Sequence, residues 1–172
     1  GTRFTIELEL PIASEQQIHE KKENQIEELA KNLNGCRILL AEDNDLNAEI
    51  AMTILQEHGV QVERAVNGEE CVEMLKAQTA DYYDAVLMDI QMPVMNGYDA
   101  ARAIRQLTTP HAAVSIIAMT ANAFEEDKQK AFAAGMDAYI TKPVDVVSMM
   151  KTLHQIIETH RSDPDLSENK YL

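Results

Sequence analysis

Asp84-Ala-Val-Leu-Met-Asp89 is a run of apolar residues that ends in a carboxylate. The same order, an apolar run and then polar groups, occurs three more times: Arg37–Ala41 before Glu42-Asp43, Val114–Met119 before Thr120, and Ala138–Thr141 before Lys142-Pro143. Apolar runs of this length, separated by helix-like stretches, indicate buried parallel strands. In an open parallel sheet, ligands bind beyond the carboxyl ends of the strands. We therefore expect three carboxylates, a hydroxyl and an ammonium group to meet at one place, able to hold a divalent metal and a phosphoryl group.

The composition narrows the class of protein. With 172 residues, 45% of them hydrophobic, the chain has room for one α/β domain and some additional structure. Its 29 acidic and 15 basic residues give a formal charge of −14, which argues against direct nucleic-acid binding. There is no signal-peptide pattern and no apolar stretch near the roughly 18 residues of a membrane span. We expect a cytoplasmic chain without membrane contact, in which Cys36 and Cys71 are reduced thiols.

A strand-then-helix pattern repeats five times from Arg37 onward. The expected strands are 37–41, 61–66, 84–89, 114–119 and 137–141, and the expected helices are about 45–58, 68–79, 97–107, 121–134 and a last one that ends near His160. Parallel strands with right-handed crossovers, covered on both faces, form a three-layer α/β/α sandwich. The second strand is more polar and is expected at the sheet edge. This domain should span residues 36–160, and the polar tail 161–172 should fray.

The first 35 residues have a different pattern. Residues 4–10 alternate apolar and polar side chains, the period of a half-buried strand, and Pro11 ends the run. Residues 14–35 read as a linker helix with Ser14 as its N-cap and Asn34-Gly35 at its end. We expect the lone strand in residues 1–13 to be the end of a larger domain. Because its edge is unpaired, this strand should either pair with a neighbouring molecule or be poorly ordered. A dimer could form through this strand or through the linker helix.

Four motifs resemble those of the receiver domain of two-component response regulators, in the family's order. They are Leu40-Ala-Glu-Asp-Asn44, Met88-Asp-Ile-Gln-Met-Pro-Val-Met-Asn-Gly97, Met119-Thr-Ala121 and Tyr139-Ile-Thr-Lys-Pro143. The resemblance covers about residues 37–160 and is specific because several separate motifs agree. It implies a flavodoxin-like fold with the strand order 2-1-3-4-5 and a site at the switch point between the first and third strands.

The resemblance also implies the chemistry of the site. Asp89 would be the phosphoacceptor, whose carboxylate attacks a phosphohistidine and becomes an aspartyl phosphate. Lys142 would place an ammonium charge, and Thr120 a hydroxyl hydrogen bond, on the phosphoryl oxygens. Positioning and charge neutralisation would supply the rate.

A carboxylate that attacks an anionic phosphoryl group needs its charge offset first. The resemblance implies Mg²⁺, with Mn²⁺ as the alternative, held by Asp43, Asp89 and the backbone carbonyl of Gln91. Glu42 stands where the family more often has Asp, and it would act through a bound water.

Two further features follow from the resemblance. Gln91 and Asn122 occupy the positions that tune how fast water reaches the phosphoryl group. Thr120 and Tyr139 would form a switch: when the hydroxyl moves to the phosphoryl group, the ring turns inward. That would reshape the face formed by the fourth receiver helix, the fifth strand and the fifth receiver helix.

The opening Gly1-Thr-Arg-Phe-Thr-Ile-Glu-Leu-Glu-Leu-Pro11 is similar to the last strand of a histidine-kinase ATP-binding domain. This similarity implies the C-terminal part of a hybrid histidine kinase. The expected partners are a kinase phosphohistidine domain, in the same chain or another, and a histidine phosphotransfer protein. The fragment lacks the kinase's own ATP-binding motifs, so it would not itself be a kinase.

Other interpretations remain open at this point. A pseudo-receiver that acts only as a docking module would lack an acidic residue or the lysine, and none is missing. A haloacid-dehalogenase-type phosphatase also has a nucleophilic Asp after a strand, but it carries a general acid two residues on, where this chain has Gln91. Acidic residues after a strand can also simply cap the next helix, and we expect Asp45 to do so.

Overall fold

The computed structural model describes residues 15–121 and 124–162. Five parallel strands form one sheet in the order β2-β1-β3-β4-β5, which confirms the expected flavodoxin-like topology. The strands are β1 (Arg37–Ala41), β2 (Gln61–Ala65), β3 (Ala85–Asp89), β4 (Ser115–Thr120) and β5 (Ala138–Thr141). The more polar strand β2 lies at an edge, as predicted.

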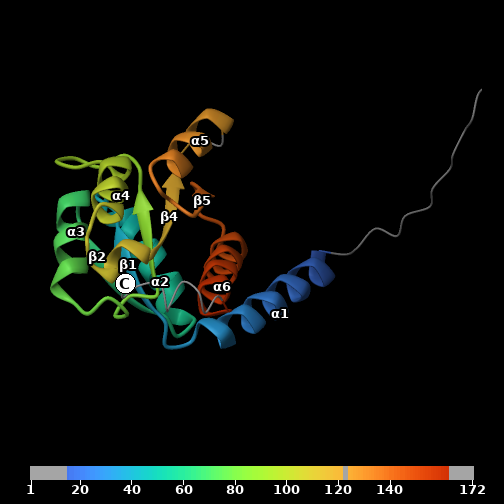
Figure 1. The fold of residues 1–172 in the computed structure, drawn as a ribbon. Helices are drawn as coiled ribbons and strands as arrows, with labels where there is room; N and C mark the ends of the chain where they lie inside the picture. The colour runs from blue at the N-terminus through green and yellow to red at the C-terminus, as the bar shows by residue number, and fades with distance from the viewer. Residues whose placement is uncertain (1–14, 122–123, 163–172) are drawn as a thin grey trace, which may run out of the picture.

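Helices cover both faces of this sheet (Figure 1). The helices are α1 (Glu15–Leu33), α2 (Asp45–Glu57), α3 (Gly68–Ala77), α4 (Gly97–Arg105), α5 (Glu125–Ala133) and α6 (Val146–Ser162), with a 3-10 turn η1 (Pro110–Ala113) before β4. The layer of α3, α4 and α5 covers one face, and α2 and α6 cover the other. None of the helices in the described residues combines the length and the apolarity needed to span a membrane.

Alternation along the inner strands fills the two halves of the core. In β1, Leu39 points into the α3–α4 half, whereas Ile38 and Leu40 point into the α2–α6 half. Strands β3 and β4 divide their side chains in the same way, and every residue of these two strands is buried. A strand buried on both faces has no polar side, which is why the sequence shows continuous apolar runs there.

Several boundaries differ from the sequence prediction. Helix α5 begins at Glu125 rather than near Ala121, because β4 runs on through Thr120 and the residue before the helix, Phe124, has an extended backbone. Helix α6 continues through Ser162, so Arg161 and Ser162 belong to it and not to the tail. The predicted strand at residues 4–10, the N-cap Ser14 and the tail beyond residue 162 lie outside the described residues.

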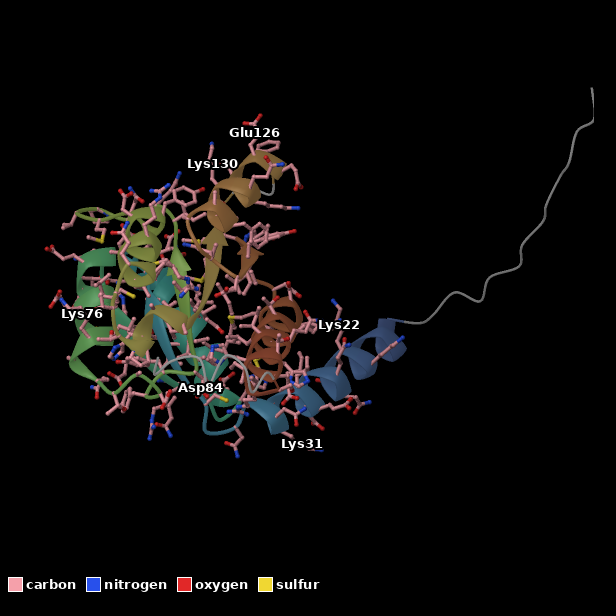
Figure 2. The ribbon with its side chains drawn as sticks, viewed as in Figure 1. Lys22, Lys31, Lys76, Asp84, Glu126 and Lys130 are labelled. Atoms are coloured by element: carbon pink, nitrogen blue, oxygen red, sulfur yellow. The ribbon has the colours of Figure 1, made fainter. Side chains whose placement is uncertain are left out.

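Helix α1 is joined to the rest of the molecule by its last turns. Leu33 is buried, and Leu29 and Ala30 pack against the same core half as α6. Gly35, at φ 81°, turns the chain from α1 into β1. The amino-terminal half of α1 extends away from the sheet (Figure 1), and Lys22 and Lys31 on this helix are exposed (Figure 2).

Arg105, at the end of α4, joins several segments at the amino-terminal ends of strands β4 and β5. Its guanidinium donates to the carbonyl oxygens of Gly135 at 2.8 Å and of Ala112 and Val114 at 2.7 Å each. It also pairs with Asp137 Oδ2 at 2.8 Å. One side chain therefore joins α4, the start of β4 and the loop before β5.

We expect Arg105→Ala to lower the free energy of unfolding by about 3 kcal/mol, because several hydrogen bonds to a charged donor are lost at once. For a domain of this size that is roughly 6–12 °C in melting temperature. Thermal unfolding followed by circular dichroism measures it. The control is Arg102→Ala on the same helix, since Arg102 makes an exposed ion pair with Asp99 that should contribute less than about 1 kcal/mol. Equal melting temperatures for the two variants would contradict the role given to Arg105.

Candidate functional site

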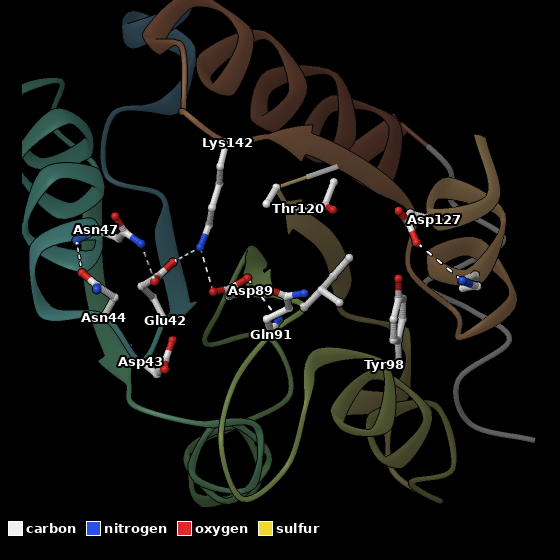
Figure 3. Close-up of a pocket in the computed structure, with 13 residues that line it drawn as sticks. Glu42, Asp43, Asn44, Asn47, Asp89, Gln91, Tyr98, Thr120, Asp127 and Lys142 are labelled. Atoms are coloured by element: carbon white, nitrogen blue, oxygen red, sulfur yellow. Dashed lines mark hydrogen bonds and ion pairs between the residues drawn. The ribbon is translucent and has the colours of Figure 1, made fainter. Parts of the chain in front are cut away.

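A cleft of about 380 Å³ lies at the carboxyl ends of the strands. Glu42 and Asp43 enter it after β1, Asp89 ends β3, Thr120 ends β4, and Lys142 follows β5 (Figure 3). The structure thus brings together the residues that the sequence predicts at this edge of the sheet. They come from segments up to 100 positions apart in the chain.

Lys142 joins two of the carboxylates. Its Nζ lies 2.5 Å from Glu42 Oε2 and 2.7 Å from Asp89 Oδ2 (Figure 3). Both acids are buried, with 1% and 6% of their surface exposed. An ammonium ion between two buried carboxylates offsets part of their mutual repulsion.

The two ends of this contact have shifted pKa values. Burial raises the pKa of Asp89 and the charge of Glu42 adds to this, while the hydrogen bond from Lys142 opposes it. For Lys142, burial alone would lower the pKa, but the hydrogen bonds and charges of Asp89 and Glu42 outweigh burial and raise it. Lys142 is therefore held as an ammonium ion.

Glu42, Asp43 and Asp89 form the acidic cluster of this site. One oxygen from each lies within 4.8 Å of the others. The Asp43 side chain is exposed, unlike the other two. Three carboxylates so close to one another repel, and a hard divalent cation is the ligand that oxygen donors in this arrangement favour.

The start of α2 fixes Glu42. Asn44 has extended backbone angles (φ −81°, ψ 119°), and its side chain accepts from Asn47 N at 3.0 Å, so Asn44 is the N-cap. The prediction that Asp45 caps this helix is wrong, because Asp45 is already its first residue. Asn47, one turn further, donates from Nδ2 to Glu42 Oε1 at 3.0 Å.

The loop after Asp89 is held against it. Gln91 N donates to Asp89 Oδ1 at 3.2 Å. Gly97, the first residue of α4, lies so close that an added Cβ would come within 2.3 Å of the Asp89 carbonyl oxygen. Only glycine permits this approach, which lets α4 begin directly behind the acid.

The predicted switch residues lie on neighbouring strands. Thr120 is buried at the end of β4, and its carbonyl accepts from Lys142 N at 2.7 Å. Tyr139 is half-buried, with its ring 6.2 Å from that of Phe132 and 4.6 Å from Lys128 Nζ, both on α5. Asn122 lies outside the described residues.

The sequence prediction missed Asn47 and several further residues at or beside this cleft. Tyr98 of α4 and Asp127 of α5 line its wall (Figure 3). Lys130 also lines the cleft and pairs with Asp127 at 3.6 Å. Arg64 of β2 contacts the backbone of the segment that carries Glu42 and Asp43. A lone Arg in an edge strand carries no local signal for such a contact, whereas the turn spacing Asn44–Asn47 could have indicated the N-cap.

Comparison with known proteins gives one consistent family. The family model for the response regulator receiver domain matches residues 38–154. "Hybrid signal transduction histidine kinase L" of Dictyostelium discoideum is 39% identical over 112 residues, which cover 63% of this chain and 6% of that protein. "Histidine kinase 1" of Arabidopsis thaliana is 33% identical over 170 residues, covering 80% of this chain and 14% of that protein. The chain thus spans a small part of the length of these relatives.

Two solved structures are similar over most of the chain. The receiver domain of sensor histidine kinase PA1611 from Pseudomonas aeruginosa PAO1, with a magnesium ion in its active-site cleft, is 36% identical at a TM-score of 0.66 and covers 72% of this chain and 98% of its own. The complex of the Saccharomyces cerevisiae phosphotransfer protein Ypd1 with the receiver domain of Ssk1 matches at 30% identity and a TM-score of 0.68, covering 74% of this chain and 92% of that chain.

Proposed function

The chain belongs to the response regulator receiver domain family of two-component phosphorelays, and on that premise we propose that its Asp89 takes a phosphoryl group from a phosphohistidine. One observation carries this assignment: Lys142 Nζ lies 2.7 Å from Asp89 Oδ2, inside a cluster of three carboxylates. Neither a helix cap nor a surface ion pair needs three acids and a lysine from three separate strand ends.

A divalent cation fits this donor set. Glu42, Asp43 and Asp89 offer oxygens within 4.8 Å of one another, and the Gln91 carbonyl would complete the protein's ligands. Mg²⁺, with Mn²⁺ as the alternative, would offset the negative charge of the acids and of the incoming phosphoryl group. The direct contacts of Glu42 with Lys142 and Asn47 support an indirect role for that acid, through a bound water.

The side chains divide the transfer between them. An Asp89 carboxylate oxygen forms a bond to phosphorus while the bond from phosphorus to the histidine nitrogen breaks, and the imidazole leaves with that electron pair. The Lys142 ammonium, which contacts the Asp89 carboxylate before the transfer, would then donate to a phosphoryl oxygen. The Thr120 hydroxyl would donate to a second phosphoryl oxygen. These groups act by position and charge, which is how phosphoryl transfer is mainly catalysed.

The switch proposal concerns Thr120 and Tyr139. Tyr139 is already half-buried against α5, so its ring can take up space that the Thr120 side chain vacates. Such a movement would change the face formed by α5, β5 and α6. Gln91 lines the cleft, and we propose that it and Asn122 tune the lifetime of the phosphoryl group.

An apolar surface beside the cleft supports a phosphotransfer protein as the partner. Leu46 and Ile50 of α2 are 64% and 48% exposed. Ile50, Pro143 and Val144 line a mostly apolar hollow next to Lys142. A helical partner that carries a phosphohistidine could cover this surface and so bring the imidazole to Asp89. The solved complex of a related receiver with a phosphotransfer protein favours this kind of partner.

We propose that the parent protein is a hybrid histidine kinase. This part of it would lie in the cytoplasm, also where the whole kinase is anchored in a membrane. Several of the relatives are named hybrid signal transduction histidine kinases. The match to "Histidine kinase 5" of Arabidopsis thaliana, at 32% identity, covers 91% of this chain and so includes part of the segment before the receiver. The phosphohistidine donor would then lie in the same chain or in a partner kinase.

The experiment is incubation with phosphoramidate, a small donor with a phosphorus–nitrogen bond like that of phosphohistidine. With Mg²⁺ the chain should gain one phosphoryl group, labile to base and to hydroxylamine, measured by intact-protein mass spectrometry. Excess EDTA should prevent the gain, since the three carboxylates then have no cation to offset them. Equal labelling with and without EDTA, or a base-stable product, would refute the proposal.

A further inference from the structure

Arg64 holds the segment that carries two of the acids. It is the last residue but one of β2, in register with Leu40 of β1, and its side chain is 21% exposed. Its Nε donates to the Glu42 carbonyl at 3.0 Å and its Nη2 to the Asp43 carbonyl at 3.1 Å. Its third nitrogen, Nη1, pairs with Asp45 Oδ1 at 2.8 Å. One guanidinium thus contacts three of the four residues 42–45, from the end of β1 to the first residue of α2.

The Asp43 carboxylate depends on this backbone more than the other acids do. Glu42 is fixed through its own side chain by Lys142 and Asn47, and Asp89 by Lys142 and Gln91. Within residues 15–121 and 124–162, no hydrogen bond or ion pair reaches the carboxylate of Asp43, which is exposed. The main chain therefore sets where the Cβ of Asp43 lies and which side-chain rotamers can bring its carboxylate to the cluster.

We propose that Arg64 is a positioning residue, which holds the Asp43 main chain so that its carboxylate faces the divalent cation. This inference rests on the proposed function, since it assumes that Asp43 is a ligand. The planar fork of an arginine can donate in two fixed directions at once, and here it joins two successive carbonyls. Groups that orient metal ligands typically contribute 10–100-fold to metal affinity.

The charge of Arg64 should lower the affinity of the site for a cation, whereas its two hydrogen bonds to the backbone should raise it. A test has to separate these two effects. A guanidinium near the cluster repels a cation, so a neutral substitute would remove that repulsion along with the two hydrogen bonds. Arg64→Lys keeps the charge, and a lysine can still pair with Asp45. It cannot donate to both carbonyls in the two directions of the fork, so this variant tests the geometry alone.

The test is Mg²⁺ binding to the whole chain by isothermal titration calorimetry, with the melting temperature of the metal-free protein recorded separately. Wild type should bind one Mg²⁺, and Arg64→Lys should bind it about tenfold more weakly. Asp45→Asn removes the ion pair and leaves both carbonyl contacts in place. Its affinity should stay within roughly twofold of wild type, because an exposed charge is screened. Arg64→Gln loses the fork and the charge together, and it should also bind more weakly, because the roughly tenfold loss from geometry exceeds the roughly twofold gain from one charge removed.

The outcomes separate this inference from the function beneath it. If wild type itself binds no Mg²⁺, the proposed metal site fails and Arg64 has nothing to position. If wild type binds and Arg64→Lys and Arg64→Gln bind equally well, the positioning role is wrong even where their metal-free melting temperatures fall. If Asp45→Asn loses as much affinity as Arg64→Lys, the ion pair and not the fork is responsible, and the inference is again overturned.

Discussion

Asp89→Asn should abolish covalent labelling by phosphoramidate and Mg²⁺. The amide has nearly the shape of the carboxylate but is not a nucleophile, so no acyl phosphate can form. Its carbonyl oxygen can still accept from Lys142, which now donates to Asp89 Oδ2 at 2.7 Å. Because burial raises the pKa of Asp89, the charged form is disfavoured in the fold, and removing that charge should not lower the melting temperature.

The matched control is Asp81→Asn. Asp81 is an exposed acid that precedes β3, whereas Asp89 is the last residue of β3, so the two acids lie at opposite ends of this strand. This variant should be labelled at the wild-type rate. Undiminished labelling of a folded Asp89→Asn protein would show that the acceptor lies elsewhere. The comparison is made by intact-protein mass spectrometry over a time course.

Lys142→Met should slow labelling by about 10²–10³-fold, the usual effect of removing one donor from a developing anion. The side chain keeps its length and loses its charge, so the phosphoryl oxygens lose the ammonium that now contacts Asp89 and Glu42. Lys151→Met is the control, because Lys151 is exposed on α6. A labelling rate within threefold of wild type for Lys142→Met would contradict the role of this lysine.

The same variant should change how stability depends on pH. Lys142 opposes the rise in the pKa of Asp89, so the pKa should rise further without it. A carboxyl group with a higher pKa in the folded state costs stability above that pKa, and the cost disappears as the pH falls through it. The melting temperature of Lys142→Met should therefore fall furthest below wild type at neutral pH and approach it in acid. A difference that stays constant from neutral pH down to about pH 4, near the ordinary pKa of an Asp carboxyl group, would contradict this in buffer without divalent cations.

The sequence predicts the strands of the sheet and most residues of the cleft, because apolar runs mark the strands and the polar residues that end these runs mark the cleft. A strand buried on both faces must be continuously apolar, so the polar residue that ends each run marks the sheet edge. Asp89, Thr120 and Lys142 stand at such ends and meet in the structure. The strand order came from the resemblance, since apolar runs alone do not say which strands are neighbours.

Other details depend on three-dimensional contacts that no local pattern contains. Asn44 and Asp45 are both good N-cap residues, and only the extended backbone of Asn44 distinguishes them. Arg64 reaches the loop after β1 only because β2 pairs with β1 in one particular register. Helix α5 begins at Glu125, later in the chain than predicted, because β4 continues through Thr120. Each of these features is set by neighbouring strands or loops.

The acceptor itself can be read directly from the labelled protein. Borohydride reduces an aspartyl phosphate to homoserine, which tandem mass spectrometry locates in the digested chain. We predict homoserine at position 89 and unmodified acids at Glu42 and Asp43, the other members of the cluster. Homoserine at a different position, or none in a protein that has gained a phosphoryl group, would contradict the assignment of Asp89.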